Sequence, residues 1–137
     1  MDNIYGWESM LLEPISFWQE IPPEISSRYH YYNIPVSDNL THKDSVLRVL
    51  KKNAKVDDFV AIKLDIDTPD VELAIVEDIL KYPQLAGLID ELYFELHYQC
   101  ELLASCWGYQ KFMMDHHSGI QLFVKLRKLG IRAHFLV

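Results

Sequence analysis

The stretch Phe59-Val-Ala-Ile-Lys-Leu-Asp-Ile66 decides the fold class of this chain. Apart from Lys63 and Asp65, its residues are apolar, and successive side chains of an extended backbone point to opposite faces. A strand that is apolar on both sides is typical of parallel sheets, because helices cover both of their faces. We therefore expect this stretch to be a strand buried on both faces of a parallel sheet.

The residues after this strand alternate between helical and strand patterns. Thr68 is a candidate N-cap for a helix over 71–81, and an apolar strand is expected over 88–96. Helical spacing returns at 119–129, and a strand pattern follows over 131–137. Such an alternation predicts parallel strands that are joined by crossover helices.

The first third of the chain is expected to contain shorter elements. Strand patterns occupy 3–7 and 28–36, and helical patterns occupy 15–20 and 45–52. The segment 99–107 fits either a helix or an ordered loop. With 137 residues and no low-complexity linker, residues 1–137 are expected to form a single domain. The predicted fold class is α/β, a Rossmann-like three-layer sandwich with a mostly parallel sheet.

The composition narrows the range of functions that this chain can have. The formal net charge is -7, from 13 Lys and Arg against 20 Asp and Glu, which argues against nucleic acid and anionic membrane surfaces as partners. No apolar run is long enough to span a bilayer, and the first basic residue, Arg28, comes too late for a signal peptide. Two cysteines, Cys100 and Cys106, do not form a disulfide framework. We therefore expect a cytoplasmic protein.

Acidic, hydroxyl and metal-ligating side chains gather where the predicted strands end, namely Glu8, Ser37, Asp38, Asp65, Asp67, Glu95 and His97. Ligands of open parallel sheets bind outside the carboxyl ends of the strands, so this set predicts ligand contact. Asp65 and Asp67 lie two residues apart on one strand face. With Glu95 and His97 they form an oxygen-rich set able to hold a divalent cation. A metal-dependent enzyme that uses these four residues is therefore one alternative.

Several of these positions belong to an ordered series of motifs. Lys63-Leu-Asp65-Ile-Asp67, followed by a helix bearing Glu72, resembles the lysine-isoleucine-aspartate-valine-glutamate-glycine motif of FkbM-type class I methyltransferases. Tyr93-Phe-Glu95-Leu-His97 resembles the next strand of that family. Ile4-Tyr-Gly-Trp-Glu8 resembles its second strand, and Tyr32-Asn-Ile-Pro-Val-Ser37-Asp38 is similar to its third. The resemblance implies an S-adenosylmethionine-dependent methyltransferase.

The resemblance also implies residue roles. The cofactor-binding residues would be Glu8 at the ribose of S-adenosylmethionine, Ser37 and Asp38 beside the adenine, and Asp65 and Asp67 near the methyl donor. The catalytic residues would be His97, Glu95 and Asp65, with Glu95 and His97 facing the acceptor, a small molecule or a sugar. His97 is the expected general base for O-methylation, since imidazole changes its charge near neutral pH.

Glycine is scarce in this chain. Its five glycines are scattered and do not form the glycine-rich loop that lets the backbone of such folds approach the cofactor. The resemblance therefore covers the fold after its first strand and glycine-rich loop. We expect an incomplete fold, truncated at the N-terminus, that binds S-adenosylmethionine weakly or not at all. The remaining alternative is a non-catalytic interaction domain whose exposed sheet edge pairs with a second copy, as a homodimer, or with a missing N-terminal segment.

Overall fold

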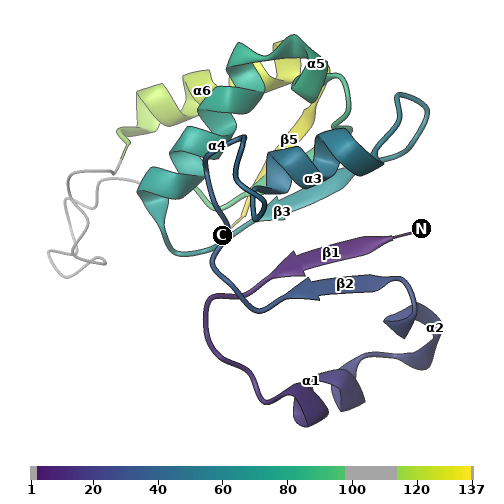
Figure 1. Cartoon of the computed structure of the whole chain (residues 1–137). Helices are drawn as coiled ribbons and strands as arrows, with labels where there is room; N and C mark the ends of the chain where they lie inside the picture. The colour runs from purple at the N-terminus through teal and green to yellow at the C-terminus, as the bar shows by residue number, and fades with distance from the viewer. Residues whose placement is uncertain (1–2, 98–113, 137) are drawn as a thin grey trace, which may run out of the picture. The chain divides into compact units, whose positions relative to one another are not determined.

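The structure, a computed structural model, describes residues 3–97 and 114–136 (Figure 1). It is a mixed α/β protein, and the strand pairs of the described residues are parallel, as the sequence predicts. The chain divides into two compact units, which we call unit 1 (Met1–Val46) and unit 2 (Leu47–Val137). The expected single domain and the three-layer sandwich stay predictions. The segment 99–107 and both cysteines lie outside the described residues.

Unit 1 contains two short parallel strands joined by two short helices. Its elements are β1 (Ile4–Trp7), α1 (Pro14–Glu20), α2 (Pro23–Ser26) and β2 (Tyr29–Tyr32). α1 begins after Glu13, whose carboxylate accepts hydrogen bonds from the backbone N–H groups of Ile15 and Ser16. Phe17 of α1 stacks on Tyr31 of β2 with 4.0 Å between the ring centroids. Aromatic contact therefore holds the crossover helix on the strand pair.

β2 is shorter than the strand expected over 28–36, because Asn33 ends the ladder. The side-chain amide of Asn33 donates to the backbone carbonyls of Glu8 at 2.8 Å and Met10 at 2.6 Å. Its Oδ1 accepts a hydrogen bond from the N–H of Leu12 at 3.0 Å. These bonds fasten the end of β2 to the loop that follows β1, so the backbone here is satisfied without further strand pairing.

Unit 2 is built on a three-stranded parallel sheet with the order β3-β4-β5. The elements are α3 (Val46–Asn53), β3 (Ala61–Leu64), α4 (Pro69–Lys81), α5 (Pro83–Ala86), β4 (Glu91–Phe94), α6 (His116–Lys128) and β5 (Arg132–Phe135). The register pairs Lys63 with Tyr93 and Tyr93 with His134. The strand and helix alternation predicted for this part of the chain is confirmed, with shorter strands than expected.

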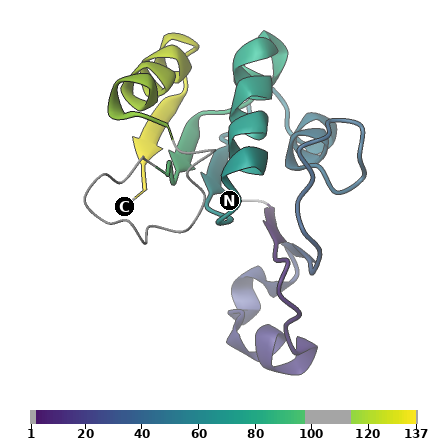
Figure 2. The ribbon, with the colours of Figure 1, turned by 90° about the vertical axis from the view of Figure 1, so that its left-hand side faces the viewer.

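One face of this sheet carries the core of unit 2. Phe123 of α6 is buried and stacks on Phe135 of β5 with 3.6 Å between ring centroids, and its ring lies 6.1 Å from that of Phe94. The buried Ile75 and Ile79 of α4 belong to the same core. α4 and α6 lie on the same side of the strands (Figure 2). Right-handed crossovers that step in one direction along a sheet place their helices on one face, which explains this arrangement.

The expectation that the strand within 59–66 is buried on both faces is wrong. Ala61 and Lys63 are exposed, Phe59 is 65% exposed, and Leu64 on the opposite face is buried. β3 is an edge strand of the three-stranded sheet, and α4 and α6 cover only the face that carries Leu64. The other face of β3 is covered by neither α4 nor α6, so β3 is half exposed despite its apolar sequence.

Candidate functional site

The carboxyl ends of β3 and β4 bring acidic side chains together. Asp65 directly follows β3, and Glu95 directly follows β4. The N–H of Glu95 donates to the carbonyl of Leu64 at 3.0 Å, so the parallel pairing continues to this point. By strand alternation, Asp65 and Glu95 share the face that is turned away from the apolar core.

Side-chain hydrogen bonds to the backbone fix the turn between β3 and α4. The N–H of Ile66 donates to Oε1 of Glu72 at 2.9 Å. Thr68 lies at the N-cap position of α4, but its side chain makes no capping hydrogen bond and donates instead to the carbonyl of Ile66 at 3.0 Å. Asp67 has a φ of 51°, in the left-handed region that aspartate tolerates better than most residues. The predicted position of Thr68 at the N-cap of α4 is therefore confirmed, while its side chain bonds to Ile66 instead of to the first turn of the helix.

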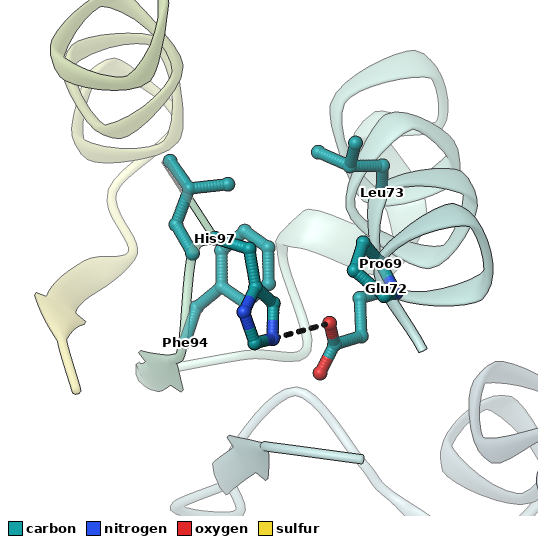
Figure 3. A pocket seen from close by; sticks show the side chains of 6 residues that line it. Pro69, Glu72, Leu73, Phe94 and His97 are labelled. Atoms are coloured by element: carbon teal, nitrogen blue, oxygen red, sulfur yellow. Dashed lines mark ion pairs between the residues drawn. The ribbon is translucent and has the colours of Figure 1, made fainter. Parts of the chain in front are cut away.

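Glu72 is a buried carboxylate that faces His97. Its residue is 0% exposed, and its Oε2 lies 3.8 Å from Nε2 of His97 (Figure 3). Burial raises the pKa of Glu72, while the N–H of Ile66 and the nearby His97 oppose that rise. Glu95 and Asp65 add to the rise, because their negative charges disfavour a third charge. Oε2 of Glu72 has no hydrogen-bond partner among the described residues.

Asp65 and Glu95 form a carboxyl pair with Lys63 beside it. Nζ of Lys63 lies 2.6 Å from Oδ2 of Asp65, and this contact, with a hydrogen bond from Glu95, lowers the pKa of Asp65. The pKa of Glu95 is raised, first by its hydrogen bond to Asp65 and then by burial. Asp65 is therefore the more acidic of the two carboxyl groups.

Three potential metal ligands converge at the same edge. One ligand atom each from Asp67, Glu95 and His97 lies within 4.8 Å of the other two. Nε2 of His97 is 4.0 Å from Oε2 of Glu95. The His97 side chain is 9% exposed, so its ring is fixed between the sheet end and α4. This set offers one imidazole nitrogen and two carboxylate oxygens to a cation or to a hydroxyl group.

Behind His97 lies a small recess rather than a ligand cavity. Its lining residues are Pro69, Glu72, Leu73, Phe94, Leu96 and His97 (Figure 3). The recess has no room for a water-sized sphere, so these side chains pack against one another. A ligand of this edge would therefore meet the exposed carboxylates and not enter between α4 and β4.

The structure brings together Asp65, Asp67, Glu95 and His97, which the sequence singled out. The other three predicted residues, Glu8, Ser37 and Asp38, belong to unit 1. There Oε1 of Glu8 accepts a hydrogen bond from the N–H of Met10 at 2.7 Å, and Oγ of Ser37 accepts one from Asn39 at 3.2 Å. Asp38 is exposed. The cofactor-binding roles of these three residues stay predictions.

Glu72 is the site residue that sequence reasoning missed. It was part of the motif resemblance but was given no role. Its spacing held a signal: Glu72 precedes Ile75, Val76 and Ile79 by three, four and seven residues, which places it on the buried face of α4. A carboxylate at such a position requires a partner inside the protein, and Ile66 supplies one.

Comparisons with protein-family models, with curated proteins and with solved structures found no match. Among the helices that the structure describes, none is both long and apolar enough to cross a bilayer.

Proposed function

We propose that unit 2 carries the ligand-binding edge of a class I methyltransferase-like domain that binds S-adenosylmethionine and methylates a hydroxyl oxygen of a small molecule or sugar. One observation carries this proposal. Asp65, Asp67, Glu95 and His97 meet at the carboxyl ends of two adjacent parallel strands, where α/β sheets bind their ligands.

The charge of this edge fits the cofactor. S-adenosylmethionine carries a positive sulfonium and a positive ammonium group, and the edge presents several carboxylates. Lys63 lies against Asp65 and lowers its pKa, and Asp67 is exposed in the turn that follows. Carboxylates attract a cation, and the exposure of Asp65 and Asp67 leaves the approach to them open. Asp65 and Asp67 are therefore assigned to the cationic methionine part of the cofactor.

The remaining groups suit the acceptor. When bound, S-adenosylmethionine supplies the methyl group that is transferred to the acceptor oxygen. His97 and Glu95 lie beside each other, and His97 is held against Glu72. His97 would accept the proton of the acceptor hydroxyl, and the neighbouring carboxylates would stabilise the resulting imidazolium.

Isothermal titration calorimetry of the full chain with S-adenosylmethionine tests the proposal. We expect weak but saturable binding with one site per chain, because the scattered glycines form no glycine-rich loop for the cofactor, and a further several-fold loss of affinity in Asp65→Asn. Asp70→Asn is the matched control, because Asp70 is an exposed carboxylate in the first turn of α4, outside the cluster. Absence of binding at millimolar cofactor, or equal loss of affinity in the two variants, would overturn the proposal.

A further inference from the structure

We infer that Asp67, Glu95 and His97 form a binding site for a divalent transition-metal ion of the zinc type. The inference depends on the geometry of the described residues alone. It does not require that the chain binds S-adenosylmethionine or transfers a methyl group.

The three side chains already surround a common point. Their ligand atoms lie within 4.8 Å of one another, and the Nε2 of His97 and the Oε2 of Glu95 are 4.0 Å apart. Zinc binds imidazole nitrogen and carboxylate oxygen at about 2.0 to 2.2 Å, so two of its ligands can stand about 3 to 4 Å apart. Small side-chain rotations of the exposed Asp67 and the half-buried Glu95 would close the site.

A second observation, the burial of Glu72, also favours a cation at this cluster. Glu72 is fully buried, and its Oε2 has no hydrogen-bond partner among the described residues. That oxygen is directed at Nε2 of His97, 3.8 Å away (Figure 3). A carboxylate this close to the ligand nitrogen contributes negative potential at the point where a cation would bind. Glu72 is thus a buried negative group placed to favour a positive ion in this cluster.

The ligand chemistry selects the class of ion. Magnesium and calcium prefer sites made of oxygen alone, whereas imidazole nitrogen favours zinc and its transition-metal neighbours. Three protein ligands leave a fourth position of a tetrahedral ion open, as in catalytic rather than structural zinc sites. The open position would take water or a hydroxyl group of a ligand.

Metal binding changes the role of one residue. With the ion bound, the nitrogen of His97 serves as a ligand and does not accept a proton. A coordinated hydroxyl group is then made more acidic by the ion itself. Metal binding is therefore measured with zinc alone. Binding of S-adenosylmethionine is measured with the cofactor alone.

Calorimetric titration of the metal-free full chain with Zn²⁺, and separately with Mg²⁺, tests the inference. We expect one saturable Zn²⁺ site per chain and much weaker binding of Mg²⁺. Asp67→Asn should weaken Zn²⁺ binding by more than about tenfold, because it removes a charged ligand. Asparagine also tolerates the left-handed backbone of this turn, so the variant should keep the fold. His97→Gln should cause a similar loss.

Two matched controls locate the ion. Asp70→Asn removes an exposed carboxylate near the site, and the double variant His116→Gln/His117→Gln removes the exposed histidine pair at the start of α6. Both should bind Zn²⁺ as the unchanged chain does. Lack of a saturable Zn²⁺ site, unchanged affinity in Asp67→Asn, or loss of binding in the double variant would overturn the inference. If His97→Gln does not fold, Asp67→Asn decides alone.

Discussion

Nε2 of His97 lies 3.8 Å from Oε2 of Glu72, a buried carboxylate whose other oxygen accepts the N–H of Ile66. Glu72 therefore connects the turn after β3 with the segment after β4. The turn carries Asp67, and the segment carries His97, so one side chain fixes the two halves of the candidate site. Removal of this side chain is expected to affect both the fold and the site.

Replacement of Glu72 separates its structural role from its charge. Glu72→Ala leaves the N–H of Ile66 without its acceptor and should lower the free energy of unfolding by about 1–3 kcal/mol. Glu72→Gln keeps an oxygen acceptor and removes a charge that is unfavourable when buried, so it should be at least as stable as the unchanged chain at neutral pH. Urea unfolding of both variants measures this difference. Equal destabilisation by Ala and Gln would contradict it.

Because the pKa of Glu72 is raised, we expect the stability of the fold to depend on pH. Burial raises the pKa of Glu72 above the ordinary value of 4.5, so the folded chain holds this proton to higher pH than the unfolded chain does. As pH rises above about 4.5, the stability of the unchanged chain should therefore fall relative to that of Glu72→Gln. Urea unfolding from pH 4 to pH 8, with a chelator present, follows the difference between the two proteins. A difference that stays constant over this range would contradict the assigned burial effect.

Phe123 should be the main anchor of α6 on the sheet. It is 1% exposed and contacts the rings of Phe135 and Phe94. Phe123→Ala should lower the free energy of unfolding by about 3–5 kcal/mol, because it removes buried apolar surface and leaves a cavity. The matched control is Ile120→Ala on the same helix, where the side chain is 55% exposed and the expected change is within about 0.5 kcal/mol. A comparable effect of the two substitutions would show that α6 is not anchored as described.

Gly130 should be required for the turn from α6 to β5. Its φ of 93° is unfavourable for residues with a Cβ, although no atom of the described residues lies within 4 Å of the position that a Cβ would occupy. Gly130→Ala should therefore cost about 1–2 kcal/mol through the backbone alone. Gly87 has an ordinary helical conformation, with a φ of -67°, so Gly87→Ala is the control and should be close to neutral. Thermal unfolding compares the two variants, and a neutral Gly130→Ala would contradict this backbone assignment.

Local sequence patterns predict the helices and strands of unit 2 well. They predict less well which faces of these elements are buried. Pro69 in the first turn and the apolar spacing after it were sufficient to indicate α4. The grouping of Asp65 with Glu95 and His97 was also predictable, because carboxyl ends of adjacent parallel strands meet at one edge. The exposure of Lys63 could not be predicted, because it depends on which face of the sheet the crossover helices cover. That choice is set by strand order, which no local pattern reveals.

The sequence predicts which residues form the candidate site, but it does not predict how their side chains interact. Strand alternation places Asp65 and Glu95 on one face, yet the hydrogen bond between their side chains depends on the exact register of β3 and β4. The 3.8 Å approach of Oε2 of Glu72 to Nε2 of His97 likewise depends on how α4 packs against the segment after β4. Such features follow from contacts between segments and are absent from the local sequence.

The central claim is that the carboxyl ends of β3 and β4 bind the methyl donor. The most direct test is an NMR titration of the isotopically labelled full chain with S-adenosylmethionine, following the backbone amide signals. The account predicts saturable shifts concentrated at 65–67 and 95–97, with little change on the far end of the same strands. Unmoved signals at these residues with millimolar cofactor, or saturable shifts confined to other parts of the chain, would contradict it.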